Sequence, residues 1–312
     1  MIGSPDAQQL AALQPQTPPQ PPAQPPAQPA AGCVRLVMVG DIVGKPGLRV
    51  TCSAIPWLRR ELHADAVVVN AENAADGSGL RCKDYRRLID HGVDGITLGD
   101  HVYKKREIIE ILESAPNIIR PANLPQQAPG KTHMLLTVRQ HIPLLVTCLL
   151  GRVFMKPVDC PFHAADRWLK EMNELQPDVR LRAVEFHAEA TSDKQLMGRY
   201  LDGRVSCVLG THTHVTTADE QILPAGTGFQ CDLGMTGPFE SILGRKINPV
   251  MEATLHGVPV PFQVATEDVR LSGTWLDLEI ATGKCQALGR IVLRQTMLSE
   301  YEAAVQAQRR VL

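Results

Sequence analysis

The first half of the chain alternates short apolar runs with amphipathic segments. Runs rich in β-branched residues, each as long as a buried strand, occur at 34–39, 66–69, 95–98 and 117–119. Segments with apolar residues at helical spacing lie between them, at 47–62, 83–91 and 104–113. Because strands that alternate with helices form a parallel sheet covered by helices, we expect such a sheet here, with Pro56 kinking or dividing the first helix.

The second half begins with a predicted hairpin and then returns to this alternation. Apolar runs at 134–138 and 144–149, on either side of residues 140–143, predict the hairpin. The pattern then predicts a helix at 164–174, a strand at 181–186, a helix at 191–201 and a strand at 205–209. Ser192 and Gln195 have the spacing of a capping box, which indicates a helix start beside them.

Beyond Gly244 the predicted strands follow one another without helices between them. They lie at 258–264, 269–280 and 287–293, before a short C-terminal helix near 299–308. We interpret these strands as an antiparallel segment that completes a second sheet.

The N-terminal residues have a composition of their own. From residue 11 to residue 31 the chain is almost wholly Pro, Gln and Ala. Such a composition buries too little apolar surface to offset the entropy of ordering, so we predict a disordered tail over 1–31 and a folded domain over 32–312. A docking segment for a Pro-binding module is the weaker alternative, because no basic residue flanks a P-x-x-P core.

Charge and composition narrow the classes of function. The 312 residues carry a formal net charge of −1, whereas proteins that cover long nucleic acid need a clear basic surplus. A small phosphorylated ligand and a homo-oligomer both stay open. We expect no membrane segment, because no run reaches roughly 18 apolar residues and residues 1–31 lack the Lys or Arg of a signal peptide. The eight cysteines form no C-x-x-C pair and fit buried thiols, so we expect a cytoplasmic protein.

Carboxylates and imidazoles follow the predicted strands at their carboxyl ends. In an open α/β sheet these ends border the crevice in which ligands bind. Three carboxylates and four imidazoles would therefore converge: Asp41, Glu72, Asp100, His101, His187, His212 and His214. Each alone has a plainer interpretation as a cap, a turn residue or a core histidine. The series at successive strand ends predicts a two-metal hydrolytic site.

The residue types indicate roles within this set. His212 and His214 flank Thr213, and alternate residues of an extended segment point the same way. Glu72 is the predicted bridge between two ions, because a carboxylate can bridge two cations and an imidazole cannot. Asp100 suits a metal ligand.

His101 and His187 complete the predicted chemistry. Imidazole titrates near neutrality, so His101 suits a proton donor at a leaving-group oxygen, while His187 offers a further nitrogen ligand. Mixed carboxylate and imidazole ligands without thiolate favour Mn, Fe or Zn over Mg or Ca. Two such ions would hold a bridging hydroxide and clamp a phosphoryl oxygen, so the expected reaction is attack of that hydroxide on phosphorus.

Seven motifs in unbroken order resemble, as a set, the YmdB-like branch of the calcineurin-like metallophosphoesterases. They are GDIVGKPG at 40–47, NAENAA at 70–75, ITLGDH at 96–101, RPAN at 120–123, FHAEATS at 186–192, GTHTH at 210–214 and DLGMTGP at 232–238. The resemblance covers about residues 33–295 and implies an α/β/β/α sandwich of two mixed sheets flanked by helices. It also implies a binuclear Fe or Mn centre, with Zn as the next metal, and phosphodiesterase activity on 2′,3′-cyclic and 3′,5′-cyclic nucleotides.

Carried over residue by residue, the resemblance implies two sets of metal ligands that share Glu72. The first set adds Asp41 and His214, with Asn73 close by. The second set adds Asp100, His187 and His212. His101 would assist the leaving group.

Three positions near the motifs depart from the pattern of this branch. Position 100 usually holds Asn, and Asp100 adds a negative charge that should tighten metal binding but repel phosphate. Tyr103 stands where the branch tends to have Trp, and Glu185 replaces an Asp. The cations at 104–106 could neutralise substrate phosphate, although a charge run at a helix start is more often a solvated face.

The sequence therefore predicts a metallophosphoesterase that hydrolyses small cyclic nucleotides. One alternative is a phosphomonoesterase or nuclease on the same scaffold. The other is a nucleotide- or RNA-associated regulatory protein with weak turnover, in which Asp100 has weakened catalysis.

Overall fold

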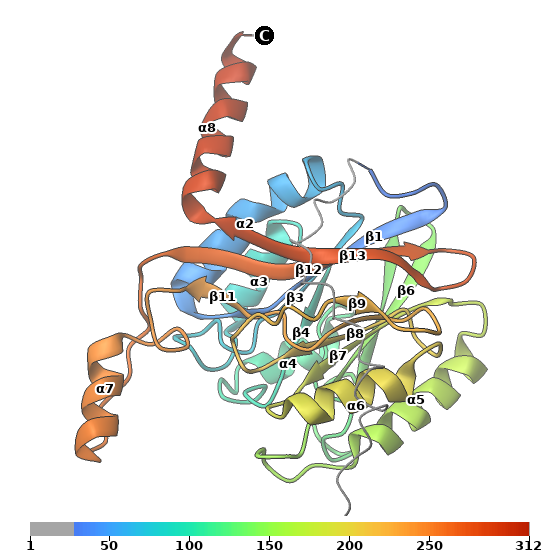
Figure 1. Ribbon diagram of the computed structural model, residues 1–312, viewed down its shortest axis with the longest axis horizontal. Helices are drawn as coiled ribbons and strands as arrows, with labels where there is room; N and C mark the ends of the chain where they lie inside the picture. The colour runs from blue at the N-terminus through green and yellow to red at the C-terminus, as the bar shows by residue number, and fades with distance from the viewer. Residues whose placement is uncertain (1–27, 312) are drawn as a thin grey trace, which may run out of the picture.

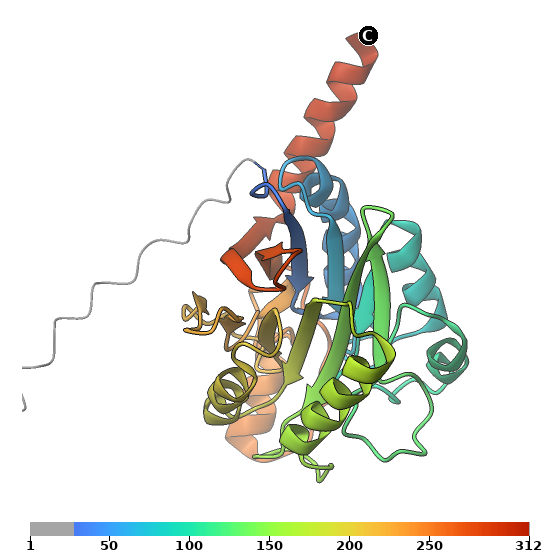
Figure 2. The ribbon, with the colours of Figure 1, turned by 90° about the vertical axis from the view of Figure 1, so that its right-hand side faces the viewer.

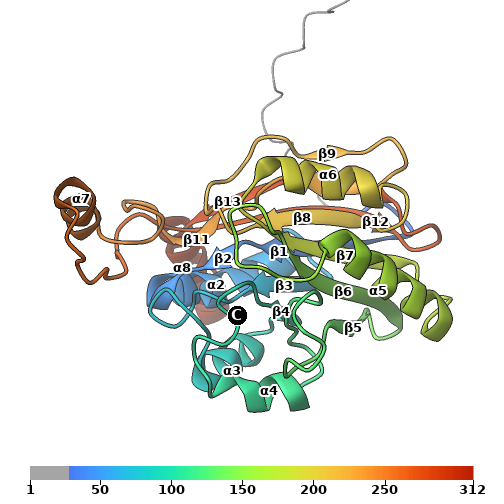
Figure 3. The ribbon, with the colours of Figure 1, turned by 90° about the horizontal axis from the view of Figure 1, so that it is seen from below.

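Two mixed β-sheets pack face to face, with helices on their outer faces, in the computed structural model, which describes residues 28–311 (Figure 1). The predicted tail falls mainly on residues 1–27, outside the described residues. Seen from below, the strands lie between α3 and α4 on one side and α5 and α6 on the other (Figure 3). The predicted α/β/β/α sandwich is confirmed.

The first sheet has the strand order β2-β11-β12-β1-β3-β4, with β13 paired to β12. Its strands are β1 (Cys33–Val39), β2 (Asp41–Ile42), β3 (Ala66–Asn70), β4 (Gly95–Thr97), β11 (Met235–Pro238), β12 (Val269–Glu279) and β13 (Cys285–Arg294). β1, β3 and β4 run parallel, and Val37 of β1 lies opposite Val67 of β3. β12 runs antiparallel to β1.

The second sheet has the strand order β5-β6-β7-β8-β10-β9. Its strands are β5 (His133–Val138), β6 (Ile142–Leu150), β7 (Leu181–His187), β8 (Cys207–Thr211), β9 (Gln221–Ile222) and β10 (Gly228–Gln230). β6, β7, β8 and β10 are parallel, and the edge strands β5 and β9 are antiparallel to their neighbours. The predicted hairpin is β5 and β6.

The helices fall into two layers and two projecting elements. The first sheet is covered by α2 (Gly44–Arg60), α3 (Cys82–Asp90) and α4 (Ile108–Ser114), and the second by α5 (Pro161–Leu175) and α6 (Thr191–Leu201). Figures 1 and 2 show α8 (Gln295–Val311) extending from the end of β13. α7 (Ile247–His256) buries no residue and stands away from the body in Figures 1 and 3.

The central strands are apolar on both faces because helices cover one face of each sheet and the other sheet covers the second face. In β1, Val37 packs in the core beneath α2–α4, whereas Leu36 and Met38 pack between the sheets. In β7, Val184 packs beneath α5 and α6, whereas Ala183 packs between the sheets. This double burial explains the near-continuous apolar runs of the sequence.

Several sequence-based predictions of local structure are wrong. Residues 258–264 form no strand, because Pro259 and Pro261 cannot donate to a ladder; only Val264 makes an isolated bridge. β12 and β13 join the first sheet through β1 and do not complete the second. The helix α7 was not predicted.

Three helices and one short strand also differ in detail from expectation. Pro56 does not divide α2, which is continuous over Gly44–Arg60. The predicted capping box is absent from α6, whose cap Ala190 makes no side-chain hydrogen bond; Ser192 lies inside the helix. α4 begins at Ile108, and the predicted strand at 117–119 is reduced to a bridge between Ile118 and Ile96.

The eight cysteines are all free, and six of them are buried. Among residues 28–311, no helix has both the length and the apolar character that crossing a membrane requires.

A buried ion pair joins β1 to β12. Arg35 donates from Nε and Nη2 to the two carboxylate oxygens of Asp277, at 2.7 and 2.8 Å, and from Nη1 to the carbonyl of Leu62 at 2.8 Å. Its guanidinium carbon lies 4.9 Å from the ring centre of Trp275. Both side chains of the pair are almost completely buried.

We expect Arg35→Met to destabilise the protein strongly, because it leaves the Asp277 carboxylate buried without its partner. The expected loss in the free energy of unfolding is about 3–5 kcal/mol, measured by urea denaturation. Asp166→Asn is the matched control: it breaks the half-exposed ion pair with Arg204 and should cost less than about 1 kcal/mol. Equal losses in the two variants would contradict the prediction.

Candidate metal centre

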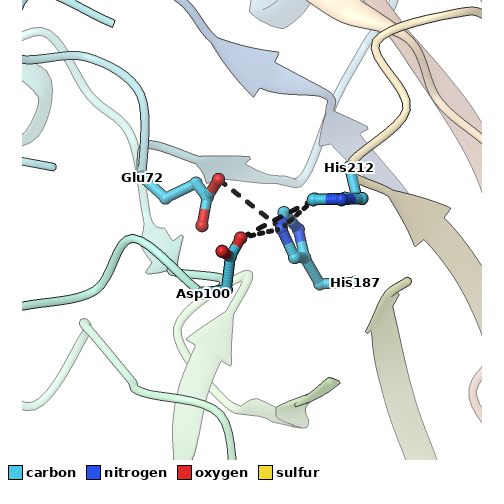
Figure 4. Close-up of side chains that lie close together, drawn as sticks. All are labelled: Glu72, Asp100, His187 and His212. Atoms are coloured by element: carbon cyan, nitrogen blue, oxygen red, sulfur yellow. Dashed lines mark hydrogen bonds and ion pairs between the residues drawn. The ribbon is translucent and has the colours of Figure 1, made fainter. Parts of the chain in front are cut away.

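The predicted site residues lie at the carboxyl ends of strands from both sheets. Asp41 begins β2 directly after β1 and Gly40, Glu72 follows β3, and Asp100 follows β4. His187 is the last residue of β7, and His212 comes directly after β8. In Figure 4, Glu72 and Asp100 from loops of the first sheet face His187 and His212 from the second. The site is therefore built where the ends of the two sheets meet.

Four side chains form the centre of the cluster: Glu72, Asp100, His187 and His212. Each offers one ligand atom, and these atoms lie within 4.8 Å of one another. Nε2 of His187 lies 3.3 Å from Oδ1 of Asp100 and 3.0 Å from Nδ1 of His212. It lies 3.5 Å from Oε1 of Glu72. Two carboxylates and two imidazoles at such spacing match the mixed ligand sets of Mn, Fe and Zn.

Asp41 is fully buried beside this centre. Its Oδ2 accepts a hydrogen bond from the backbone N–H of His212 at 2.9 Å. Its Oδ1 finds no hydrogen-bond partner anywhere in the described chain and lies 3.8 Å from Nδ1 of His187. Because a buried carboxylate oxygen without a partner is costly, this atom fits a ligand for a cation.

Asn73 and His214 extend the cluster toward solvent. Nδ2 of Asn73 donates to Oε1 of Glu72 at 3.0 Å and lies 3.3 Å from Nε2 of His214. Nδ1 of His214 lies 3.2 Å from the carbonyl oxygen of Leu243. Asn73 therefore links His214 to Glu72 of the centre.

His101 lies at the mouth of the site. Its backbone N–H donates to Oε2 of Glu72 at 2.9 Å, and its Nδ1 donates to Oδ1 of Asn73 at 2.7 Å. Its side chain is 31% exposed, whereas that of Glu72 is 1% exposed. The hydrogen bond with Glu72, together with that carboxylate's charge, raises the pKa of His101. A protonated imidazole at the opening suits proton donation to a bound molecule.

The buried charges compensate one another across the two sheets. Burial opposes a charge on His187, but Glu72, Asp100 and Asp41 raise its pKa to about 10. Burial raises the pKa of Asp41. The surrounding carboxylates thus favour a positive charge at this position, and a metal ion bound to Nε2 of His187 would take the place of a proton.

A second layer of hydrogen bonds orients His187. Its Nδ1 donates to Oγ1 of Thr211 at 2.9 Å, and Thr211 donates to Oε1 of Glu185 at 2.8 Å. Glu185 also accepts from Nδ2 of Asn70 at 2.6 Å and from Thr97. Nε2 of His187 is therefore the nitrogen directed at the cluster, as in metal sites where an imidazole is oriented through its other nitrogen.

The loop that carries His212 and His214 has a strained backbone. The φ angles of these two residues are 100° and 65°, in the left-handed region that non-glycine residues seldom adopt. Between them, Thr213 donates from its backbone N–H and its hydroxyl to Oδ2 of Asp232, at 3.1 and 2.8 Å. The same oxygen accepts from Nζ of the buried Lys194 at 2.6 Å. This buried ion pair fixes the loop.

Gly99 leaves room for the cluster. A Cβ atom at this position would lie 2.4 Å from both Oε2 of Glu72 and Nε2 of His187. Any other residue before Asp100 would therefore push the ligand atoms apart.

Arg245 is a residue of the site that the sequence did not reveal. It lines a cleft of about 320 Å³ together with Glu72, His101, His212 and His214. Its guanidinium donates to the carbonyls of Asp76 and Gly77 at 3.0 and 2.6 Å. No other Lys or Arg is found among the described residues that line the cleft, and the cations at 104–106 do not line it. No motif marks it, because it lies in an irregular segment before α7.

Comparison with known proteins identifies the family of this chain. The family model described as "YmdB-like protein" matches residues 37–291 of the chain. The chain belongs to this family. By family and fold, it is a metallophosphoesterase.

The YmdB-like chain has relatives in several bacteria. It is 40% identical, over 83% of its length and 97% of the relative's, to the 2′,3′-cyclic-nucleotide 2′-phosphodiesterase of Bacillus subtilis. It is 31% identical to a putative phosphatase/phosphodiesterase of Mycoplasma pneumoniae, over 80% of this chain and 90% of that one. The predicted enzyme class is confirmed.

Solved structures support the same YmdB-like assignment. A hypothetical protein from Thermus thermophilus is 41% identical, with a TM-score of 0.78, over 84% of this chain and 99% of that chain. A novel phosphatase from Mycoplasma pneumoniae is 29% identical, also with a TM-score of 0.78, over 84% and 94%.

We expect Thr211→Val to weaken metal binding, because it removes the hydroxyl that accepts from His187. Loss of such an outer hydrogen bond costs about 10–100-fold in metal affinity, which titration of the metal-depleted protein would measure. Thr211→Ser keeps the hydroxyl and is the matched control. If Val and Ser variants bound metal equally well, this orienting role would be wrong.

Proposed function

We propose that the protein is a two-metal phosphodiesterase that hydrolyses small cyclic nucleotides, with 2′,3′-cyclic ones first and 3′,5′-cyclic ones second. The observation that carries the proposal is the cluster of four ligand atoms beside the partnerless Oδ1 of Asp41. The Bacillus relative, named for 2′,3′-cyclic nucleotides, supports the choice of substrate.

Two metal ions would be held by ligand sets that share Glu72. Asp41 and His214 would complete one set, with Asn73 beside them, and Asp100, His187 and His212 would complete the other. Fe and Mn suit these ligands best, followed by Zn. When bound, such ions supply a nucleophile at neutral pH and a clamp for phosphoryl oxygens.

The protein's own residues would bind the diester and manage its protons. Arg245 lines the cleft and would pair with a non-bridging phosphate oxygen. His101 at the mouth would donate a proton to O2′ as the bond between phosphorus and O2′ breaks. The oxygen of one water remains on phosphorus and a proton of that water passes to solvent, so the product is a 3′-phosphate monoester.

A phosphomonoesterase on the same scaffold is the second candidate. It is favoured by the names of the Mycoplasma relatives, a putative phosphatase/phosphodiesterase and a novel phosphatase. Comparison of kcat/KM for a 2′,3′-cyclic nucleotide and for the corresponding 3′-monophosphate separates the two activities.

Glu72→Gln should abolish hydrolysis of a 2′,3′-cyclic nucleotide by the Mn- or Fe-loaded protein. An amide group cannot bridge two cations, and its NH₂ would face the donors of Asn73 or His101. We expect kcat/KM to fall at least about a thousandfold, or about 4 kcal/mol.

The control is Glu189→Gln, which removes a carboxylate from the same cleft. Oε2 of Glu189 lies 3.2 Å from Nε2 of His212, but its side chain is 47% exposed. We expect a loss below about tenfold. Metal-loaded wild-type protein that left a broad panel of diesters intact would refute the proposed function.

Asp100→Asn separates an ordinary enzyme from a regulatory protein with weak turnover. Oδ1 of Asp100 faces His187 and His212, at 3.3 and 3.7 Å, and an amide oxygen could take its place. We expect weaker metal binding but a kcat within about tenfold of wild type when metal is saturating. A gain of about a hundredfold or more would favour the regulatory alternative.

A further inference from the structure

A cavity of about 770 Å³ lies beside the metal cleft, and the proposed chemistry does not use it. It is bordered by the start of α2, the start of α3 and the segment 262–266. Its volume is more than twice the 320 Å³ of the metal cleft. We call it the basic cavity, because five cations line it: Lys45, Arg49, Arg81, Lys83 and Arg87.

The basic cavity has a surplus of positive charge. Only two carboxylates line it, Asp76 and Asp84, and Arg81 is paired with Asp76. Among the residues whose side chains the structure describes, Lys45, Arg49 and Lys83 have no partner in a hydrogen bond or ion pair. Three unpaired cations around one hollow suit an anionic ligand, although the whole chain carries a net charge of −1.

The basic cavity also offers an aromatic ring. Phe262 lines it and is 46% exposed, next to the apolar side chains of Leu48 and Val264. Cations that hold a backbone phosphate, together with an exposed aromatic on which a base stacks, are the usual elements of a site for single-stranded nucleic acid.

A single wall separates the basic cavity from the metal cleft. Asn73 and Gly77 line the cleft, whereas Ala74 and Asp76 line the cavity. Arg245 holds this wall by donating to the carbonyls of Asp76 and Gly77, and its backbone forms a bridge with Val264 on the cavity side. A ligand longer than one nucleotide could therefore occupy both hollows.

We propose that the basic cavity binds the adjoining nucleotide of a short RNA whose 2′,3′-cyclic phosphate end lies in the metal cleft. The inference rests on the proposed function. Attack of a ribose 2′-hydroxyl on the adjacent phosphorus of an RNA chain forms the P–O2′ bond, breaks the P–O5′ bond and leaves a 2′,3′-cyclic phosphate on the terminal ribose. The 5′-oxygen of that ribose carries the phosphate that leads to the adjoining nucleotide and its base. Lys45 and Arg49 bind that phosphate, and the base stacks on Phe262. The reaction in the cleft is unchanged.

The first test compares a 2′,3′-cyclic mononucleotide with a trinucleotide that ends in the same cyclic nucleotide. With metal-loaded wild-type protein we expect kcat/KM to be about tenfold higher for the trinucleotide, mainly through KM. The variant Lys45→Ala/Arg49→Ala should lose this preference and keep its rate on the mononucleotide. Lys170→Ala/Arg199→Ala, which removes two exposed cations from α5 and α6, is the matched control.

The second test measures binding without catalysis. A fluorescent trinucleotide ending in a 3′-phosphate should bind wild-type protein about tenfold more tightly than Lys45→Ala/Arg49→Ala or Phe262→Ala, with an affinity that falls as salt rises. Equal affinities in all of these proteins would overturn the subsite. If the wild-type protein hydrolysed no diester, the proposed function would fail, and this binding measurement would still decide the subsite. Hydrolysis of both substrates at equal kcat/KM would leave the proposed function intact and overturn the subsite.

Discussion

Carboxylates from the first sheet and imidazoles from the second sheet meet inside the protein, and the architecture around them serves this contact. Nε2 of His187 lies 3.3 Å from Asp100 and 3.5 Å from Glu72, while its Nδ1 lies 3.8 Å from Asp41. Burying a carboxylate without a cation costs several kcal/mol, so the relative position of the sheets is tied to charge compensation as well as to apolar packing. A slip of β7 by one residue in its register would turn the His187 side chain to the opposite face of the sheet, because neighbouring residues of a strand face opposite sides.

Hydrogen bonds behind the ligands hold the strained loop that carries His212 and His214. His212 and His214 both have left-handed backbone conformations, which the ion pair of Lys194 with Asp232 maintains through Thr213. Thr211 of β8 and Glu185 of β7 together fix the ring of His187. Glu185 is longer than the Asp that the resemblance led us to expect, and its two oxygens reach three donors. The departure at this position is therefore accommodated by hydrogen bonding.

Residues that follow a single strand could be assigned to the site from the sequence, whereas residues brought together from distant segments could not. Asp41, Glu72 and His187 could be placed because each follows an apolar run, and the carboxyl ends of parallel strands border one crevice. Arg245 could not be placed, since its contacts with the carbonyls of Asp76 and Gly77 join segments far apart in the chain. The basic cavity likewise combines residues near positions 45, 83 and 262. The apolar composition of segment 258–264 predicts a strand, but its two prolines cannot donate hydrogen bonds to a ladder and the segment forms none.

The charge of Asp100 acts on the imidazole side of the cluster more than on the cleft, which Asp100 does not line. The Asp100 side chain is 20% exposed; its Oδ1 is directed at His187 and His212, and its Oδ2 lies 3.9 Å from Nε2 of His101, so its nearest charge partners are imidazoles. A phosphate entering the cleft would meet the His101 imidazole and the Arg245 guanidinium, together with the half-exposed carboxylate of Glu189. Coulomb interactions weaken with distance and with exposure to water, so the inward-facing carboxylate repels an entering anion less than its formal charge implies. The substitution of Asp for Asn therefore acts mainly on how tightly the imidazole side of the cluster holds a cation, and less on the approach of substrate.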